Sequence, residues 1–400
     1  MRIAIPTHSV SRRQFTLGAV ASAVTLISTR AFAAPPEGKW RAAIIGHTGE
    51  GDYGHGLDAI FAGRENIEVV GLADPVSAGR AQAAERAKAL RQYDDYRKLL
   101  EKEKPQLVCL ASRWSKQRLA MGLAALEIGA HLISEKPFTT TLAEADQLLA
   151  IADRAKLTIA VAHQMRLAPS IMELKKALDA GLIGELLEMR ASGKQDDRAG
   201  GEDMIVLGSH LFDLMRFFAG DAIFCTARVL HQGRDIVRDD ARQVKEQIGP
   251  VAGDEVTAQF AFAKGVNATF TSRKPLRGTV GHWGIEFIGS KTKVRLLADV
   301  YPAIYVLKAG AWEPAGRTDT WTRMEGDPGV ALSTEQRGFG PANRRVVDDW
   351  LTAIQQNREL ACSGFNATKS LEMIMAVYQA AFSHARVRLP LPKREHPLAT

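Results

Sequence analysis

Residues 49–54 read Gly49-Glu50-Gly51-Asp52-Tyr53-Gly54 and match the pattern G-x-G-x-x-G. An apolar run at 41–45 precedes the pattern, a helix is expected after it, and Asp74 closes a second apolar run twenty residues beyond Gly54. In a dinucleotide-binding β-α-β unit, the glycines let backbone amides approach a pyrophosphate, the helix N-terminus supplies positive potential, and the acid holds the ribose hydroxyls. The stretch therefore predicts a Rossmann domain that binds a nicotinamide dinucleotide.

The register of the glycines leaves two alternatives. Gly46 directly follows the first apolar run and can serve as the first glycine, with Thr48 in place of the second and Gly51 as the third. We therefore expect the whole loop to contribute, and its predicted cofactor-binding residues are Gly46, Thr48, Gly49, Gly51 and Gly54. Ser112, Glu135 and Lys136, which follow later strands, complete the predicted cofactor contacts.

The charge of Asp74 bears on the choice of cofactor. A carboxylate at this position repels the 2′-phosphate of NADP, so NAD is the expected cofactor. Arg80, six residues further on, can soften that preference, and NADP stays the alternative.

The order of apolar runs predicts two domains. Up to residue 164, strands at 41–45, 67–73, 106–111, 131–134 and 158–162 alternate with helical segments such as 114–128 and 142–154. This alternation requires right-handed β-α-β units and a parallel sheet. We place the Rossmann domain at 34–164 and a second, α+β domain at 165–400, whose final helices can pack back on the first.

The second domain is expected to rest on a largely antiparallel open sheet, because several β-rich runs follow one another within it. Its predicted strands are 186–192, 256–262, 266–272, 283–288 and 293–297. Its predicted helices are 169–180, 203–219, 343–356 and 368–384.

The composition is that of a globular protein, with 46% hydrophobic and 24% charged residues among 400. The formal net charge is +7, but four arginines lie in the first 33 residues, which contain no acid. The remaining chain carries +3, so no nucleic-acid partner is predicted. The three cysteines are far apart in apolar surroundings, which argues against a disulfide framework.

The first 33 residues have the order of an export signal. Ser11-Arg12-Arg13-Gln14-Phe15 precedes a short apolar stretch that ends near Ile27, and Ala31-Phe32-Ala33 supplies small residues for cleavage. The paired arginines resemble the twin-arginine signal, whose export machinery carries folded proteins. We expect a periplasmic mature chain without a membrane segment; a disordered tail and a general secretory signal are the alternatives.

Several motifs later in the chain occur in a consistent order. They are Glu135-Lys136-Pro137, then Arg166 with Pro169, Gly181-Leu182-Ile183-Gly184-Glu185, and Gly208-Ser209-His210. With the Rossmann start, they resemble the glucose–fructose oxidoreductase, inositol dehydrogenase and rhizopine-catabolism family (Gfo/Idh/MocA) over essentially the whole mature chain. The resemblance implies a carbohydrate substrate and a homo-oligomer.

The family resemblance assigns the catalytic roles to Lys136 and His210. A base must take the hydroxyl proton while hydride leaves, and a nearby ammonium stabilises the developing alkoxide. The family pattern places an aspartate four residues before this histidine, where the present sequence has Val206. Asp203 is expected two helical turns from His210, about 10 Å along the axis, whereas Asp213 can reach the same helix face.

The predicted substrate contacts come from two places. His163 and Arg166 leave the fifth strand at its carboxyl end, where open α/β sheets bind ligands. Gln195 and Asp197 belong to a polar cluster that suits a polyol, or else forms a solvated loop, and Asp213 is the fifth candidate. The ten histidines show no paired spacing typical of a metal site, so no metal is predicted.

Export narrows the expected chemistry, because the periplasm should lack a pool of free nicotinamide cofactor. A protein exported after folding can carry NAD with it, and that cofactor must then be regenerated on the enzyme. The leading hypothesis is an NAD(P)-dependent oxidoreductase acting on a sugar, polyol or glycoside with a tightly held cofactor. The alternatives are a redox-neutral NAD-dependent glycosidase or lyase on the same scaffold, and a non-catalytic sugar- or nucleotide-binding protein.

Overall fold

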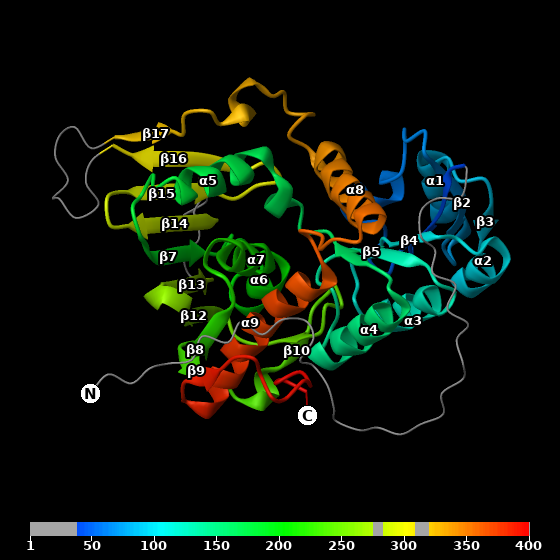
Figure 1. Cartoon of the computed structure of the whole chain (residues 1–400). Helices are drawn as coiled ribbons and strands as arrows, with labels where there is room; N and C mark the ends of the chain where they lie inside the picture. The colour runs from blue at the N-terminus through cyan, green and yellow to red at the C-terminus, as the bar shows by residue number, and fades with distance from the viewer. Residues whose placement is uncertain (1–37, 275–282, 309–319, 400) are drawn as a thin grey trace. The chain divides into compact units, whose positions relative to one another are not determined.

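The computed structural model of the chain describes residues 38–274, 283–308 and 320–399 (Figure 1). The predicted export signal at 1–33 lies outside these residues. Within the described ranges, no helix is long and apolar enough to cross a membrane. Cys109, Cys225 and Cys362 are buried free thiols, as their apolar surroundings in the sequence predict.

The first domain is built on a six-stranded parallel sheet with the order β3-β2-β1-β4-β5-β6. This is the Rossmann order, in which the connections change direction between β1 and β4 and leave a crevice at the carboxyl ends of the strands. Five of the six strands lie where the sequence predicts them, and β3 is a two-residue edge strand. The strands are β1 Trp40–Ile45, β2 Ile67–Ala73, β3 Gln92–Tyr93, β4 Leu107–Leu110, β5 His131–Ser134 and β6 Ile159–Val161.

Alternate residues of β1 belong to two hydrophobic cores, one on each face of the sheet, as the two-residue period of a strand requires. Ala43 and Ile45 pack with α2 (Tyr96–Glu103), α3 (Arg118–Glu127) and α4 (Leu142–Ala155). On the other face, Ala42 and Ile44 pack with α1 (Ser77–Ala87) and with α8 (Phe339–Gln356), a helix from late in the chain. Both faces of β1 are therefore covered by packed helices. This packing fixes the strand ends that border the crevice.

The connection between β1 and β2 differs from the prediction. The sequence predicts an α-helix after the glycine pattern, whereas the structure has the 3₁₀ helix η2 (Gly54–Ala59), broken by left-handed residues at His55 (φ 51°) and Gly56 (φ 75°). Leu57, Ile60 and Phe61 of this connection pack beside α8 in the same core. No α-helix lies between β1 and β2, whose connecting residues are all described, so a helix N-terminus is absent at this loop.

The second domain rests on a ten-stranded sheet in the order β17-β16-β15-β14-β7-β13-β12-β8-β18, with β9 paired to β8. All its pairings are antiparallel except the parallel pair β7 and β13, so the predicted largely antiparallel sheet is confirmed. Its strands are β7 Leu186–Ser192, β8 Ala222–His231, β9 Arg234–Asp235, β12 Glu255–Phe262, β13 Asn267–Arg273, β14 Gly284–Gly289, β15 Lys293–Leu297, β16 Ala303–Leu307, β17 Trp321–Arg323 and β18 Val387–Arg388. A separate ribbon pairs β10 (Arg242–Gln243) with β11 (Pro250–Val251).

Figure 1 shows the helices that lie over one face of this sheet, namely α5 (Pro169–Asp179), α6 (Gly201–Val206), α7 (Gly208–Ala219) and α9 (Gly364–Ser383). The predicted single helix 203–219 is interrupted at Leu207, so α6 and α7 are separate. Gly208 allows the backbone at this break to pack closely against the sheet, because an added Cβ would lie 3.0 Å from the Phe270 ring. The backbone N–H of His210 donates to Leu207 O at 3.2 Å, whereas a continuous helix would use Val206 O. The break therefore releases the Val206 carbonyl for another donor.

Candidate active site

Asp74 lies at the carboxyl end of β2 and is fully buried. Its Oδ2 accepts hydrogen bonds from Thr48 N at 3.0 Å, Thr48 Oγ1 at 2.7 Å and Tyr53 Oη at 2.9 Å, and its Oδ1 accepts from Val76 N at 2.9 Å. Burial, followed by the charge of Asp74, raises the pKa of Tyr53, so the phenol stays a donor. Two hydroxyl groups of the chain therefore make the contacts with this carboxylate that ribose hydroxyls make in Rossmann domains.

The predicted glycines have different roles in the structure. A Cβ on Gly46 would lie 2.2 Å from the Tyr53 ring, so this glycine allows a ring to lie against the strand end. Gly51 and Gly54 pack against Ser112 and Glu135, where an added Cβ would lie 2.5 and 2.3 Å from side-chain oxygens. Gly49 has a left-handed φ of 83°, and an added Cβ would meet no atom within 4 Å. The backbone N–H groups of Thr48, Gly49 and Gly54 already donate to Asp74, Asp52 and Ala111.

The types and positions of these residues fit a dinucleotide site. They supply the carboxylate after β2 and a glycine after β1, at the switch point of the sheet. Asp74, Gly46 and Gly49 are the residues that would hold NAD. Tyr53 is a functional candidate that the sequence analysis missed, because it stands at a variable position of the G-x-G-x-x-G pattern. Arg80 donates to the backbone oxygen of Asp74 at 2.6 Å, which keeps its guanidinium close to the carboxyl end of β2.

Glu135 follows β5 and is fully buried. His55 contacts its carboxylate through Nδ1, and the backbone N–H of Lys136 donates to the same carboxylate. Burial raises the pKa of Glu135, but the charges of His55 and Lys136 outweigh that effect and hold the pKa below its usual value. Glu135 therefore ties the β1–β2 connection to the backbone that carries Lys136. Ser112 makes a comparable tie after β4, because its hydroxyl donates to Glu50 O at 2.6 Å.

Lys136 is 6% exposed and its Nζ donates to Val206 O at 2.9 Å. The acceptor is the carbonyl that the break between α6 and α7 sets free. Burial lowers the pKa of Lys136 below its usual value, while Glu135 opposes that effect. Val206 thus contacts the predicted catalytic lysine through its backbone, although its side chain has no acid to offer.

His210, in the first turn of α7, is 8% exposed, and its Nδ1 has no hydrogen-bond partner among the described residues. Its ring meets the His163 ring edge-on, with centroids 5.4 Å apart, and the Trp283 ring at 6.4 Å. Burial, followed by the charge of Lys136, lowers the pKa of His210 well below its usual value. The neutral form of His210 is therefore favoured, and within the described residues no carboxylate forms an ion pair with its ring.

His163 and Arg166 meet Asp213 in the interior. Arg166 binds the Asp213 carboxylate with two hydrogen bonds, from Nε to Oδ2 at 2.9 Å and from Nη2 to Oδ1 at 2.7 Å. His163 Nδ1 lies 3.7 Å from Asp213 Oδ1. Burial raises the pKa of Asp213, but Arg166 and His163 outweigh that effect and lower it. Asp213 is therefore a fixed anion behind His163, and Arg166 is committed to it.

Several buried polar atoms of this cluster and its neighbours lack a hydrogen-bond partner within the described residues. His163 Nε2, Ser209 Oγ, His210 Nδ1 and Trp283 Nε1 are buried without a hydrogen-bond partner in the described part of the chain. Buried polar groups are normally satisfied, so these four atoms require partners, which a polar ligand or water would supply. Ser209 belongs to the Gly208-Ser209-His210 motif, whereas nothing in the sequence pattern singles out Trp283.

Gln195 and Asp197 lie in the loop after β7, which Asp203 organises. The Asp203 carboxylate accepts from Lys194 N, Gln195 N and Ser272 Oγ, so Asp203 has a structural role. Gln195 Oε1 accepts from Arg273 N at 3.1 Å, and Asp197 is exposed. Within the described ranges, neither residue has a hydrogen bond or ion pair with Lys136, His163 or His210.

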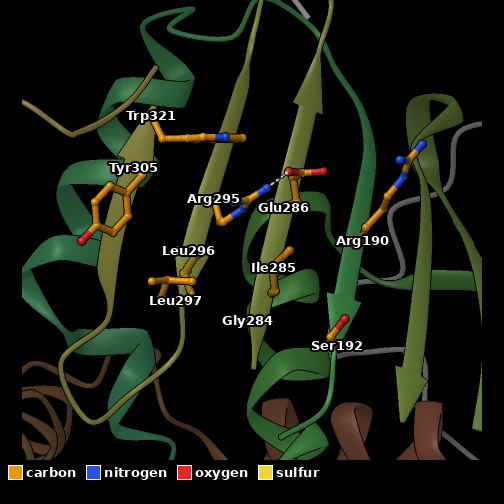
Figure 2. Close-up of a pocket in the computed structure, with 10 residues that line it drawn as sticks. All are labelled: Arg190, Ser192, Gly284, Ile285, Glu286, Arg295, Leu296, Leu297, Tyr305 and Trp321. Carbon is orange, nitrogen blue, oxygen red and sulfur yellow. Dashed lines mark hydrogen bonds and ion pairs between the residues drawn. The ribbon is translucent and has the colours of Figure 1, made fainter. Parts of the chain in front are cut away.

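A hollow lies on the second sheet, away from these residues. Figure 2 shows it between strands β7 and β17, where Arg295 pairs with Glu286 at 2.9 Å and its guanidinium lies over the Trp321 ring. Its volume is about 530 Å³, and none of the predicted site residues lines it. The hollow is therefore separate from the cluster around Lys136. Among the described residues, no group of three or more His, Cys, Asp or Glu side chains is arranged to hold a metal ion.

Two family models match this chain. The model for the oxidoreductase family, NAD-binding Rossmann fold, matches residues 40–163, and the model for the oxidoreductase family, C-terminal alpha/beta domain, matches residues 175–389; both describe Gfo/Idh/MocA proteins. D-apiose dehydrogenase of Paraburkholderia graminis is 27% identical over 348 residues, which cover 84% of this chain and 87% of that protein.

Solved structures share the fold. A levoglucosan dehydrogenase in complex with NADH and levoglucosan superposes with a TM-score of 0.71 at 19% identity, covering 88% of this chain and 100% of that one. An oxidoreductase from Agrobacterium radiobacter in complex with NAD+, L-tartaric acid and magnesium gives a TM-score of 0.68 at 19% identity, covering 88% and 98%.

Proposed function

Because the chain belongs to the Gfo/Idh/MocA oxidoreductase family, with an NAD-binding Rossmann domain, we propose that it oxidises a hydroxyl group of a sugar, polyol or glycoside. One observation carries the proposal. The buried ammonium of Lys136 stands after the carboxyl end of β5, and its charge acts on His210, in a cluster with several buried polar atoms that have no partner within the described residues. A polyol supplies the dense hydrogen bonding that such a cluster requires.

The relatives support a carbohydrate substrate. D-apiose dehydrogenase and levoglucosan dehydrogenase are both named for carbohydrates. Among the described residues, Lys136 is the only lysine of the cluster, and Arg166 is neutralised by Asp213. A neutral hydroxyl compound therefore suits the site better than a substrate that needs two cationic anchors.

The chemistry divides between the cofactor and the chain. NAD, when bound, supplies the hydride acceptor. Lys136 holds its ammonium at a buried position, where a positive charge stabilises a developing alkoxide more strongly than it does in water. Ser209 and Trp283 present donors that can orient the remaining hydroxyls, and the buried setting excludes water from the reacting carbon.

We also propose that the mature protein acts in the periplasm with a cofactor that it carries and retains. The Arg12-Arg13 motif supports this proposal, since export after folding allows a bound dinucleotide to travel with the protein. Replacing both arginines by lysine should leave the full-length precursor in the cytoplasmic fraction. Normal appearance of the mature chain in the periplasm would contradict the proposal.

A retained cofactor makes a redox-neutral reaction the second candidate. Transient oxidation of one carbon acidifies its neighbour and permits elimination, hydrolysis or epimerisation, after which the hydride returns. The two candidates separate in a screen of sugars and glycosides with and without an external hydride acceptor. Turnover that depends on the acceptor supports the oxidoreductase, and turnover without it supports the redox-neutral enzyme.

The decisive first experiment is the cofactor content of the purified protein, measured by absorbance and mass spectrometry. We expect nicotinamide dinucleotide near one equivalent, or binding of added NADH with a stoichiometry of one per chain. Absence of the cofactor together with no affinity for NAD or NADP would overturn both enzymatic proposals and favour a non-catalytic binding protein.

A further inference from the structure

We propose that His163, positioned by Asp213, is the catalytic base that takes the substrate hydroxyl proton. His210 is then a neutral residue that lines the same site and forms a hydrogen bond with the substrate. The inference rests on the proposed function and deepens it, because it moves the proton-accepting role from the histidine that the family resemblance favours to another residue. The observations that carry it are the geometry around His163 and, among the described residues, the absence of a carboxylate paired with His210.

The Asp213 carboxylate is held in one orientation. Arg166 binds both of its oxygens, and Arg166 Nη2 also donates to Asp213 O at 3.0 Å. Asp213 and His163 side chains are 2% and 4% exposed, so water does not screen the pair. His163 itself is fixed by its backbone, because its N–H donates to Val161 O at 2.7 Å and its carbonyl accepts from the Cys362 thiol at 3.4 Å.

This geometry selects a tautomer of His163. Nδ1 faces the Asp213 carboxylate at 3.7 Å, so the neutral ring keeps its proton on Nδ1 and leaves the lone pair on Nε2. Nε2 is buried and has no partner among the described residues. A separation of 3.7 Å is longer than a hydrogen bond, but such contacts often shorten when substrate binds. His163 is therefore prepared to accept a proton at Nε2.

His210 lacks this arrangement. The position four residues before it is Val206, and its Nδ1 has no partner in the described part of the chain. The imidazolium form of His210 would stand close to Lys136 and His163 without a compensating anion, and the pKa of His210 is lowered well below its usual value by burial and by these charges. A proton on His163 is compensated by Asp213, whereas a proton on His210 is not.

The charged groups around His163 come from three elements. They are Asp213 on α7, Arg166 on η3 (Gln164–Leu167), and Lys136 with Glu135 after β5. Burial lowers the pKa of His163, Asp213 opposes that effect, and Arg166 and Lys136 add to it. The neutral base is therefore present at physiological pH, and proton uptake depends on the Asp213 carboxylate.

The proposed step is balanced. The O–H bond of the substrate breaks, its proton passes to His163 Nε2, and its electron pair forms the second carbon–oxygen bond. The carbon loses a hydride to the nicotinamide cofactor, so the alcohol is oxidised by two electrons and the cofactor is reduced. Lys136 stabilises the alkoxide while the proton moves, and in the reverse direction His163 returns the proton.

The first test needs no turnover. Nitrogen NMR of histidine-labelled protein, with His163 assigned from the H163Q spectrum, should show neutral His163 protonated on Nδ1, and D213N should abolish this preference. A neutral ring protonated on Nε2 in the wild type would overturn the proposal, even if D213N fails to fold. Failure of the wild type to bind NADH would instead overturn the proposed function and leave the tautomer result standing.

The second test compares matched variants on a substrate found in the screen. H163Q should lower kcat about 10²–10⁴-fold, the usual contribution of a general base, with the Kd for NADH unchanged. H210Q should lower kcat about 10-fold or less. In D213N the acidic limb of the kcat/KM profile should move to lower pH, because the imidazolium loses its counter-charge. A larger loss in H210Q than in H163Q, or an unmoved limb in D213N, would overturn the proposal.

Discussion

The two ends of the candidate site differ in how their polar groups are satisfied. At the nucleotide end, the Asp74 carboxylate is fully occupied by Thr48, Tyr53 and a backbone amide of the chain itself. At the substrate end, four buried polar atoms of His163, Ser209, His210 and Trp283 have no partner within the described residues. The same fold thus contains one carboxylate satisfied by the chain's own donors and one cluster of unpaired polar groups.

This difference indicates two modes of ligand binding. A ribose that binds Asp74 must replace hydrogen bonds that the chain already makes, so its net gain is the difference between two similar interactions. A substrate hydroxyl that meets His163 or Ser209 satisfies atoms that otherwise remain buried and unpaired, which costs about 1–3 kcal/mol each. We therefore expect substitutions at the substrate end to change rate strongly and those at the nucleotide end to change affinity moderately.

The largest expected effect is at Lys136. K136M removes the buried ammonium while keeping an unbranched side chain, and should lower kcat about 10³-fold, the usual loss when one group that stabilises a developing oxyanion is removed. The Kd for NADH should change little. The matched control is K102M, which removes an exposed lysine of α2 and should leave kcat unchanged. Near-normal kcat in K136M would exclude Lys136 from the reaction.

The second effect is on cofactor affinity at Asp74. D74N keeps an acceptor but removes the charge, and should raise the Kd for NADH about 10-fold, since the ribose exchanges with hydrogen bonds that the chain already makes and the net difference is at most about 1.5 kcal/mol. Fluorescence titration measures the change, with circular dichroism as a check on folding. D94N, at an exposed aspartate in the same domain, should not alter the Kd. An unchanged Kd in D74N would place the ribose elsewhere.

A smaller and opposite change tests whether Tyr53 competes with the ribose. Y53F keeps the ring against Gly46 but removes the hydroxyl that donates to Asp74. The Kd for NADH should fall about 2–10-fold, because the displaced hydrogen bond is worth about 0.5–1.5 kcal/mol. Y93F removes a tyrosine hydroxyl that contacts Glu103 instead, and should leave the Kd unchanged. Weaker binding in Y53F would show that the phenol remains in place and contacts the cofactor.

Most of the fold was accessible from the sequence, because apolar periodicity reports burial directly. The runs at 67–73 and 131–134 coincide with β2 and β5 to the residue. The prediction failed where tertiary contacts decide the local structure. The helix expected after Gly54 is replaced by η2, whose face is covered by the distant α8, and the helix 203–219 is broken at Leu207 by packing against Phe270.

The site was accessible only in part for the same reason. The motifs locate Lys136 and His210, and the strand end locates His163, but spacing along the chain does not reveal which carboxylate faces which ring. The contact between Asp213 and His163 joins residues fifty positions apart, and the contact between His55 and Glu135 joins residues eighty apart. Such pairs follow from the topology, which brings β5, β6 and α7 to one crevice.

The smallest expected effect on catalysis is at His131, which tests whether an unpaired buried histidine atom is enough to mark a ligand site. His131 Nε2 also has no partner among the described residues, but His131 begins β5, at the end opposite to Lys136. H131N keeps an acceptor near the position of Nδ1, which accepts from Thr158 N at 3.0 Å. It should therefore leave kcat and the Kd for NADH unchanged.

The role of His131 should show in stability. Burial lowers the pKa of His131 to about 4, below the value of about 6.5 in the unfolded chain. The unfolded state therefore binds the extra proton first, and stability falls as the pH drops from about 6.5 to about 4, by roughly 3 kcal/mol for this group. Urea unfolding at pH 7 and pH 5 should show a smaller fall in H131N than in the wild type. Loss of kcat in H131N with an unchanged pH dependence of stability would mean that position along the strand does not separate structural from functional histidines.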